Sequence, residues 1–143
     1  MTGERVLIVD DEAELRETLA ERMTARGLTV ATAASGAEAL EILEHRDFDA
    51  VVLDLAMPGL DGVETLRRML SINPDLQVIL LTGQATVKKS IEVMKLGALD
   101  LLEKPTDLRV LIAKIEEASD KKALLFEQRT EKQISDILKK KGW

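Results

Sequence analysis

The sequence AVVLDLAMPGLDG, residues 50–62, decides the fold. Four consecutive apolar residues, Ala50 to Leu53, run into Asp54, and residues 57–59 (Met-Pro-Gly) predict a turn. A continuous apolar run of this kind predicts a strand buried on both faces, as in a parallel sheet. Asp54 ends the strand, so its carboxylate is expected at the carboxyl edge, where open α/β sheets bind ligands. We therefore place Asp54 at the centre of the candidate site.

Four further apolar segments indicate strands, and helical patterns separate them. The predicted strands are residues 5–10 (RVLIVD), 28–33 (LTVATA), 50–54, 77–82 (QVILLT) and 98–102 (ALDLL). The predicted helices cover about 11–26, 35–44, 61–72, 86–96 and 106–118. Five strands alternating with five helices imply right-handed βαβ units. The sequence therefore predicts an α/β fold with a doubly wound, five-stranded parallel sheet.

Apolar spacing within the helices predicts which faces are buried. Ser35 followed by Glu38 forms a capping box at the second helix, and Asp61 is expected to cap the third. The spacing favours buried stripes in the first and fourth helices and core positions for three methionines. These residues are Leu15, Leu19 and Met23; Val87, Ile91 and Met94; and Met69.

The composition excludes several classes of protein. The chain has 143 residues, 45% hydrophobic and 32% charged, which is typical of one soluble globular domain. It has no cysteine and one histidine, so disulfides, thiolate metal sites and multi-histidine metal sites within it are excluded. No apolar run reaches membrane-spanning length, and the first residues lack a signal-peptide pattern. We therefore expect a cytoplasmic protein without membrane contact.

The charge is divided unevenly along the chain. Residues 1–120 contain 13 basic and 23 acidic residues, a difference of −10, whereas residues 121–143 contain 7 and 3, a difference of +4. An acidic globule with a basic end argues against nucleic-acid binding by the main body.

Polar side chains end four of the predicted strands. They are Asp10 and Asp11, Asp54, Thr82 and Lys104. In a parallel sheet these ends share one edge. Three carboxylates there repel one another unless a cation is present, and an oxygen-only ligand set favours Mg²⁺. Lys104 and Thr82 supply the charge and the hydroxyl that a transferred phosphoryl group needs, and Asp54 could accept it as a nucleophile.

These residues lie in four motifs: VDDE, DLAMPGLDG, TG and GALDLLEKP. Over residues 5 to about 119 the chain resembles the CheY-like receiver domain of two-component response regulators. The resemblance implies a flavodoxin-like sheet in the order 2-1-3-4-5. It also implies phosphorylation of Asp54 by a sensor histidine kinase, with Mg²⁺ held by Asp10, Asp11, Asp54 and the Ala56 carbonyl. Thr82 and Lys104 would contact the phosphoryl group, and the peptide bond before Pro105 would be cis.

Leu101 departs from the family pattern. Receivers usually carry Tyr or Phe three residues before the lysine, and this aromatic residue moves inward on phosphorylation. Leucine has no polar tip and a smaller body, so we predict a muted or differently routed switch.

Three other classes fit less well. A flavodoxin-like electron carrier would bind phosphate at its first loop, where Asp10 and Asp11 would repel it. A phosphatase of the haloacid dehalogenase type needs a second acid two residues after the nucleophile, where this chain has Ala56. A pseudo-receiver, which would serve only for interaction, would have lost part of the ionic site. We therefore expect a switch that catalyses only its own phosphorylation and dephosphorylation.

Residues 121–143 lie beyond the predicted receiver of residues 1–120. Their apolar residues form a short helical stripe without a sustained heptad repeat. A frayed or self-packed helical extension and a linker from a longer protein both fit. The segment could also pair two chains or dock on an acidic partner, and the downstream partner is not identified by the sequence.

Overall fold

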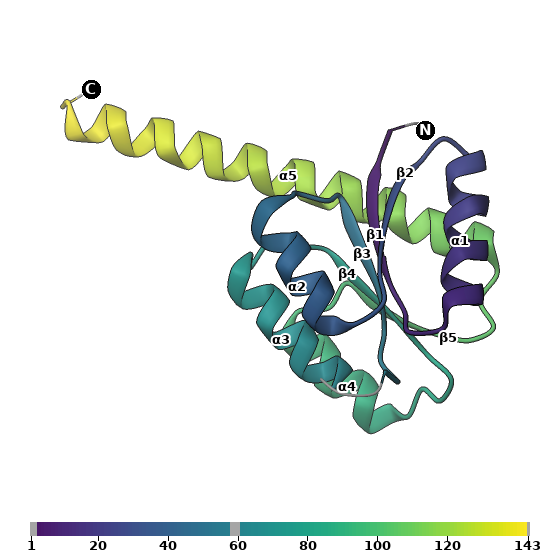
Figure 1. The fold of residues 1–143 in the computed structure, drawn as a ribbon. Coiled ribbons are helices and arrows are strands. Elements are labelled where there is room, and N and C mark those ends of the chain that lie inside the picture. Colours follow the sequence, from purple (N-terminus) through teal and green to yellow (C-terminus); the bar gives the residue numbers. More distant parts are fainter. Residues whose placement is uncertain (1–2, 58–60, 143) are drawn as a thin grey trace.

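The computed structural model describes residues 3–57 and 61–142, so most of the turn predicted at residues 57–59 lies outside the described residues. Strands and helices alternate along the chain (Figure 1). The strands are β1 (Arg5–Val9), β2 (Thr29–Ala33), β3 (Ala50–Asp54), β4 (Val78–Thr82) and β5 (Asp100–Glu103). The helices are α1 (Ala13–Ala25), α2 (Gly36–His45), α3 (Gly62–Ile72), α4 (Val87–Leu96) and α5 (Leu108–Lys140).

The strands form one parallel sheet in the order β2-β1-β3-β4-β5. Every residue of β3 and β4 is buried, whereas the edge strands β2 and β5 are largely half-buried or exposed. This difference explains the sequence pattern, because only a strand covered on both faces needs a continuous apolar run. The predicted fold class and strand order are confirmed.

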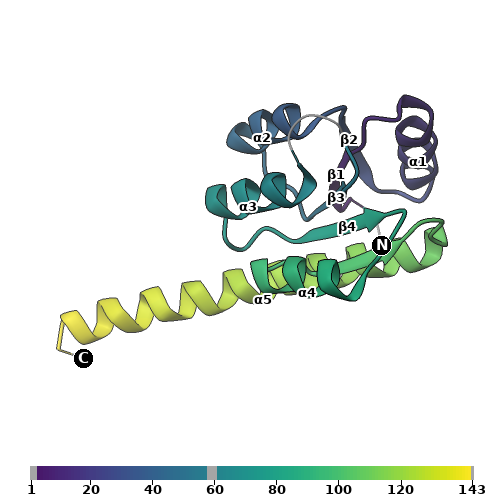
Figure 2. The ribbon, with the colours of Figure 1, turned by 90° about the horizontal axis from the view of Figure 1, so that it is seen from below.

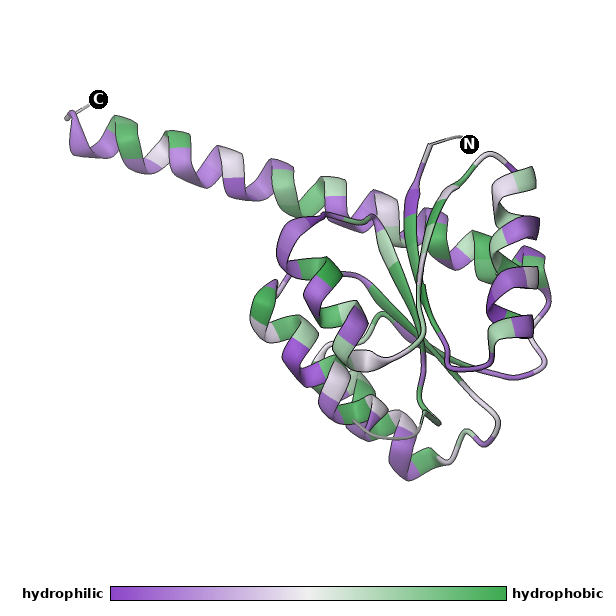
Figure 3. Ribbon diagram, in the orientation of Figure 1, coloured by the Kyte–Doolittle hydropathy of each residue, from purple (hydrophilic) through white to green (hydrophobic). Residues whose placement is uncertain are grey.

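Two apolar cores lie on opposite faces of the sheet. One contains residues of α2, α3 and α4, and the other contains residues of α1 and α5. Figures 1 and 2 show these helices around the sheet, and Figure 3 shows hydrophobic strands between helices of mixed character. The layers leave the loops at the carboxyl ends of the strands free to form a site.

Side-chain caps fix where several helices begin. The Ser35 hydroxyl accepts a hydrogen bond from the Glu38 N–H at 3.1 Å, and the Asp61 carboxylate accepts one from the Val63 N–H at 2.8 Å. Glu38 itself accepts from the Ala34 N–H, one residue before the position expected in a capping box. Caps of this kind satisfy N–H groups that have no partner within the helix.

The predicted buried stripe of α4 is wrong. Val87, Ile91 and Met94 are 78%, 51% and 46% exposed, and Val93 is the buried residue of the helix. The helix presents Val93 and the half-buried Leu96 to the core, and a short helix can cover the sheet with only one of its two apolar faces. In α1, Met23 is buried as expected, but Leu15 is 40% exposed.

The last helix continues far beyond the predicted end near residue 118. α5 contains 33 residues and runs without interruption from Leu108 to Lys140, so the segment after residue 120 is neither self-packed nor separated by a break. Figure 1 shows its second half projecting from the globule. Good helix formers fill residues 119–140, and neither glycine nor proline interrupts them.

No helix within residues 3–57 and 61–142 combines the length and the apolar character needed to cross a membrane.

Candidate acidic site at the carboxyl edge of the sheet

Two carboxylates of the site are buried. Asp10 directly follows β1 and Asp54 ends β3, and the two residues are 4% and 3% exposed. Asp10 Oδ1 accepts a hydrogen bond from the Glu12 N–H at 3.0 Å, and Asp54 Oδ1 accepts one from the Ala56 N–H at 3.1 Å. Because each carboxylate is fixed by the backbone two residues later, one of its oxygens keeps a defined position.

Lys104 supplies the positive charge of the site. Its Nζ lies 3.3 Å from Asp54 Oδ2 and 3.5 Å from Asp10 Oδ2. The lysine follows β5, so β1, β3 and β5 each contribute one member of this ionic cluster. The ammonium therefore contacts Oδ2 of Asp54, whereas Oδ1 accepts the hydrogen bond from the Ala56 N–H.

Burial and charge shift the proton affinities of the cluster. Burial raises the pKa of Asp10 above its ordinary value, against the Glu12 hydrogen bond and the Lys104 charge, and the charge of Asp54 adds to the rise. Burial opposes the charged form of Lys104, but the attraction of Asp10 and Asp54 outweighs it, so the pKa of Lys104 is raised. The site thus holds more negative charge than its own lysine balances.

The three carboxylates could hold a metal ion. Ligand oxygens of Asp10, Asp11 and Asp54 all lie within 4.8 Å of one another, and Asp11 is exposed to solvent. Oxygen ligands of this number and charge suit a hard divalent cation that keeps some of its water, as Mg²⁺ does. The residues present therefore fit the cation that the sequence predicts.

Thr82 ends β4 beside this cluster and is 6% exposed. Its hydroxyl lies 3.3 Å from both the N–H and the carbonyl oxygen of Gln84, so it is engaged with its own loop. Thr82 and Ala56 line one open cleft of about 460 Å³. The cleft borders the residues that follow Asp54 and Thr82 at the ends of β3 and β4.

The remaining predicted residues lie in β5, directly after it, or after β3. The Lys104–Pro105 peptide bond is cis. Leu101 pairs in register with Leu80 and packs, half-buried, against the core on the α4 side. The Ala56 N–H contacts Asp54, and the metal-binding role of the Ala56 carbonyl stays a prediction.

Two contacts at the site were not predicted from the sequence. Arg16 on α1 donates from Nη1 to the carbonyl oxygen of Asp10 at 2.7 Å. Glu103 accepts a hydrogen bond from the Ala85 N–H at 2.9 Å and so ties β5 to the loop after Thr82. Glu103 precedes Lys104 directly, but its partner is 18 residues away along the chain, and residue spacing does not indicate such a contact.

Comparison with known proteins identifies the same region. A family model described as "Response regulator receiver domain" matches residues 6–116. The chain is 38% identical over 127 residues to the C4-dicarboxylate transport transcriptional regulatory protein DctD of Pseudomonas aeruginosa, a match that covers 88% of this chain and 27% of that protein. It is 37% identical over 131 residues to Response regulator MprA of Mycobacterium sp. (strain KMS), with coverage of 85% and 57%.

These two relatives are longer than the chain, which covers about a quarter of one and just over half of the other. The fold also matches the crystal structure of a response regulator receiver domain protein (CheY-like) from Methanospirillum hungatei JF-1. That match has a TM-score of 0.80 and 29% identity, and it covers 85% of this chain and 98% of that one.

Proposed function

The chain belongs to the response regulator receiver family, and on this premise we propose that it is a phosphorylation switch with Asp54 as acceptor. The donor is the phosphohistidine of a sensor histidine kinase. The observation that carries the proposal is the ionic cluster at the carboxyl edge, where Asp54 and Lys104 lie 3.3 Å apart beside Asp10 and Asp11.

In the proposed reaction, a carboxylate oxygen of Asp54 attacks the phosphorus atom and a mixed anhydride forms. The phosphorus–nitrogen bond to the histidine breaks, and the electron pair returns to the imidazole. The Lys104 ammonium balances negative charge on the transferred group, and the Thr82 hydroxyl can turn from Gln84 to donate to a phosphoryl oxygen. Mg²⁺ bound by the three aspartates would neutralise their mutual repulsion and the phosphoryl oxygens.

The proposed catalytic activity is limited to the protein's own aspartate. It catalyses its own phosphorylation and the later hydrolysis of the anhydride, and it turns over no separate substrate. A cytoplasmic location goes with this proposal, because kinase domains of two-component systems act there. The expectation that no nucleic acid binds concerns the acidic globule only, since one longer relative is named a transcriptional regulatory protein.

The downstream protein is proposed to bind the apolar face of α4. Val87, Ile91 and Met94 are exposed there, next to the strand that carries Leu101. A second copy of the chain is a further proposed partner, through residues 121–143, where Phe126 is 73% exposed. A sedimentation profile that does not change when residues 121–143 are deleted contradicts the pairing of two chains.

Intact mass spectrometry after incubation with acetyl phosphate tests the acceptor. We expect one added phosphoryl group in the presence of Mg²⁺, none when EDTA replaces Mg²⁺, and none in Asp54→Asn. The matched control is Asp120→Asn, an exposed aspartate of α5, which should accept the group as the parent does. An unmodified parent after rapid sampling, with a histidine kinase also tried, would favour a pseudo-receiver.

A further inference from the structure

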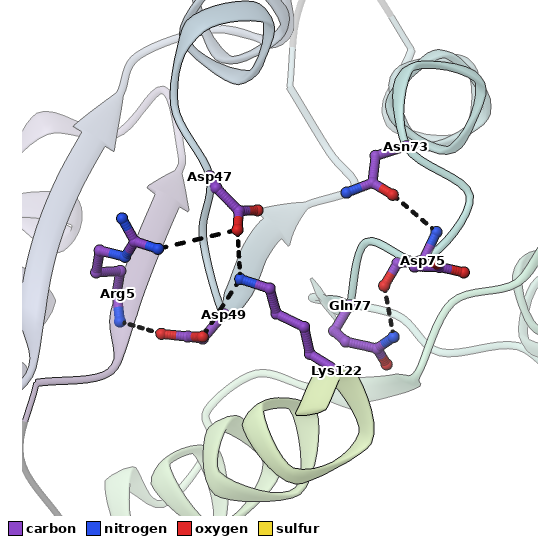
Figure 4. Close-up of polar contacts among 7 residues, drawn as sticks. All are labelled: Arg5, Asp47, Asp49, Asn73, Asp75, Gln77 and Lys122. Carbon is purple, nitrogen blue, oxygen red and sulfur yellow. Dashed lines mark hydrogen bonds and ion pairs between the residues drawn. The ribbon is translucent and has the colours of Figure 1, made fainter. Parts of the chain in front are cut away.

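A second ionic cluster lies at the amino edge of the sheet, opposite the acidic site. Lys122 of α5 places its Nζ 2.6 Å from Asp47 Oδ2 and 3.4 Å from Asp49 Oδ1 (Figure 4). About two helical turns later, Arg129 forms an ion pair with Asp75. The acidic partners lie in the segments that precede β3 and β4. The ion pairs therefore connect α5 to the loops at the amino ends of two central strands.

The acidic partners are held in place by their own neighbours. Asp49 Oδ2 accepts a hydrogen bond from the Arg5 N–H at 2.7 Å. The Asp75 N–H donates to Asn73 Oδ1 at 3.0 Å, and the Asp75 carbonyl accepts from Gln77 Nε2 at 2.7 Å (Figure 4). The Asp49 carboxylate is already ordered by the Arg5 N–H, so it loses less side-chain freedom when it pairs with Lys122, whereas the bonds at Asp75 fix the backbone from which its carboxylate projects.

The basic partners lie on the same side of α5 as its buried residues, although Arg129 itself is exposed. The face begins with three buried residues and continues with a lysine, a half-buried leucine and an arginine, in steps of four and three residues. These are Leu111, Ile115, Ala118, Lys122, Leu125 and Arg129. The same side of the helix is thus apolar over the sheet and ionic beyond it, and two of the basic residues of 121–143 face acidic partners on the globule.

Apolar packing beneath this part of the helix is incomplete. A cavity of about 170 Å³ separates α5 from the globule between Phe48, Leu76 and Phe126, and Phe126 remains 73% exposed. The side chains of Lys122 and Asp49 are only 26% and 22% exposed, so solvent screens this pair less than it screens surface pairs. Arg129 is 60% exposed and its partner Asp75 is 24% exposed, so that pair is screened more strongly. Ion pairs are therefore the specific contacts that connect the helix to the globule here.

We propose that Asp47, Asp49, Asp75, Lys122 and Arg129 form an amino-edge clamp that docks the chain's own extension and sets the direction in which it leaves the globule. The acidic edge is an interaction surface, and its occupant is the basic first part of the extension. Residues 131–140 are all exposed, so their direction follows from the first part of the same helix, which Leu111, Ile115 and Ala118 pack on the sheet and the clamp holds beyond it. The clamp does not depend on whether Asp54 accepts a phosphoryl group.

Distance measurements between two spin labels test the clamp. The chain has no cysteine, so cysteines introduced at the exposed positions Glu41 on α2 and Gln133 on α5 can be labelled selectively. We expect a narrow distance distribution in the parent. It should broaden about twofold in the double variant Lys122→Ala/Arg129→Ala, because local order follows the contacts that support it. Raising the salt concentration to about 1 M should broaden the parent distribution too.

Two comparisons separate the clamp from a general effect of charge or stability. Lys121→Ala/Lys132→Ala removes the same charge from exposed lysines of the same helix that have no ion-pair partner among the described residues, and it should leave the distribution narrow. Exchanging the charges in Asp75→Arg/Arg129→Asp should restore order that Asp75→Arg alone removes. A distribution in Lys122→Ala/Arg129→Ala as narrow as that of the folded parent would overturn the proposal.

Discussion

Asp10→Asn is expected to stabilise the protein in the absence of divalent cations. The asparagine keeps an acceptor oxygen for the Glu12 N–H and removes only the charge. That charge is attracted by Lys104, but it is repelled by two carboxylates and disfavoured by burial. The sign of the effect follows from which of these contributions is larger.

Coulomb energies at the observed distances give the magnitude. At an effective dielectric constant of about 20, the attraction of Lys104 at 3.5 Å is worth about 5 kcal/mol. Repulsion from Asp11 and Asp54, at separations up to 4.8 Å, is worth about 3.5 kcal/mol each. The repulsion exceeds the attraction by about 2 kcal/mol, and screening at the exposed Asp11 reduces this excess, so we expect a gain of about 1–2 kcal/mol.

Urea unfolding followed by circular dichroism in EDTA at pH 7 measures the gain, with Asp120→Asn as the control. The raised pKa of Asp10 adds a pH signature. Native protein binds this proton more tightly than unfolded protein, so the stabilisation from the protonated carboxyl is complete below about pH 3.8 and is lost as the pH rises through the raised value. The advantage of Asp10→Asn should therefore be full at pH 7 and shrink in acid.

Mg²⁺ should reverse the order of stability. At one hundred times its dissociation constant, a cation that binds only the native state stabilises the parent by about 2.7 kcal/mol, which exceeds the gain expected for Asp10→Asn, and that variant has lost one ligand. A variant that is less stable than the parent in EDTA would refute the reasoning, because attraction to Lys104 would then outweigh the repulsion and burial.

Lys104→Met should destabilise the cation-free protein by about 3 kcal/mol, because it leaves two buried carboxylates without their counter-charge. Since the pKa of Lys104 is raised, its contribution to the free energy of unfolding should be complete below pH 10.5 and should be lost as the pH rises through the raised value. Urea unfolding at a series of alkaline pH values measures this loss. Gly62→Ala places a Cβ 2.6 Å from the carbonyl oxygen of Leu55 and should cost about 2 kcal/mol in unfolding free energy. Nuclear magnetic resonance spectra of the phosphorylated protein should show smaller shifts around Leu101 than in Leu101→Tyr, and a full rearrangement in the parent would contradict the muted switch.

Much of the fold could be predicted because its strands differ in burial. The continuous apolar runs of β3 and β4 correspond to strands covered on both faces, and the polar residues that end them meet at one edge, as parallel strands require. Lys104 lies beside Asp10 and Asp54, as the strand pattern predicts, and the functions of these residues stay predictions.

The errors have physical causes that a single sequence does not reveal. α4 carries two apolar faces, and only the sheet decides which is buried, so spacing alone placed Met94 in the core. The predicted end of α5 near residue 118 follows from the length that a receiver domain needs, not from a break in the helical pattern. The ion pairs of Lys122 and Arg129 with the globule are not visible in the sequence, because their acidic partners lie about 50 to 75 residues earlier in the chain.

Because α5 is long, a small change of its angle at the clamp moves its far end by a large distance. From Lys122 to Lys140 the helix rises about 27 Å, so a tilt of about 10° at the clamp moves the far end by about 5 Å. Asp49 and Asp75 precede the strands that end at Asp54 and Thr82, and each of those strands is a rigid five-residue rod. A displacement of either strand that tilts α5 by this small angle would therefore move the tip by about 5 Å, a change of position that any further domain or partner bound there would follow.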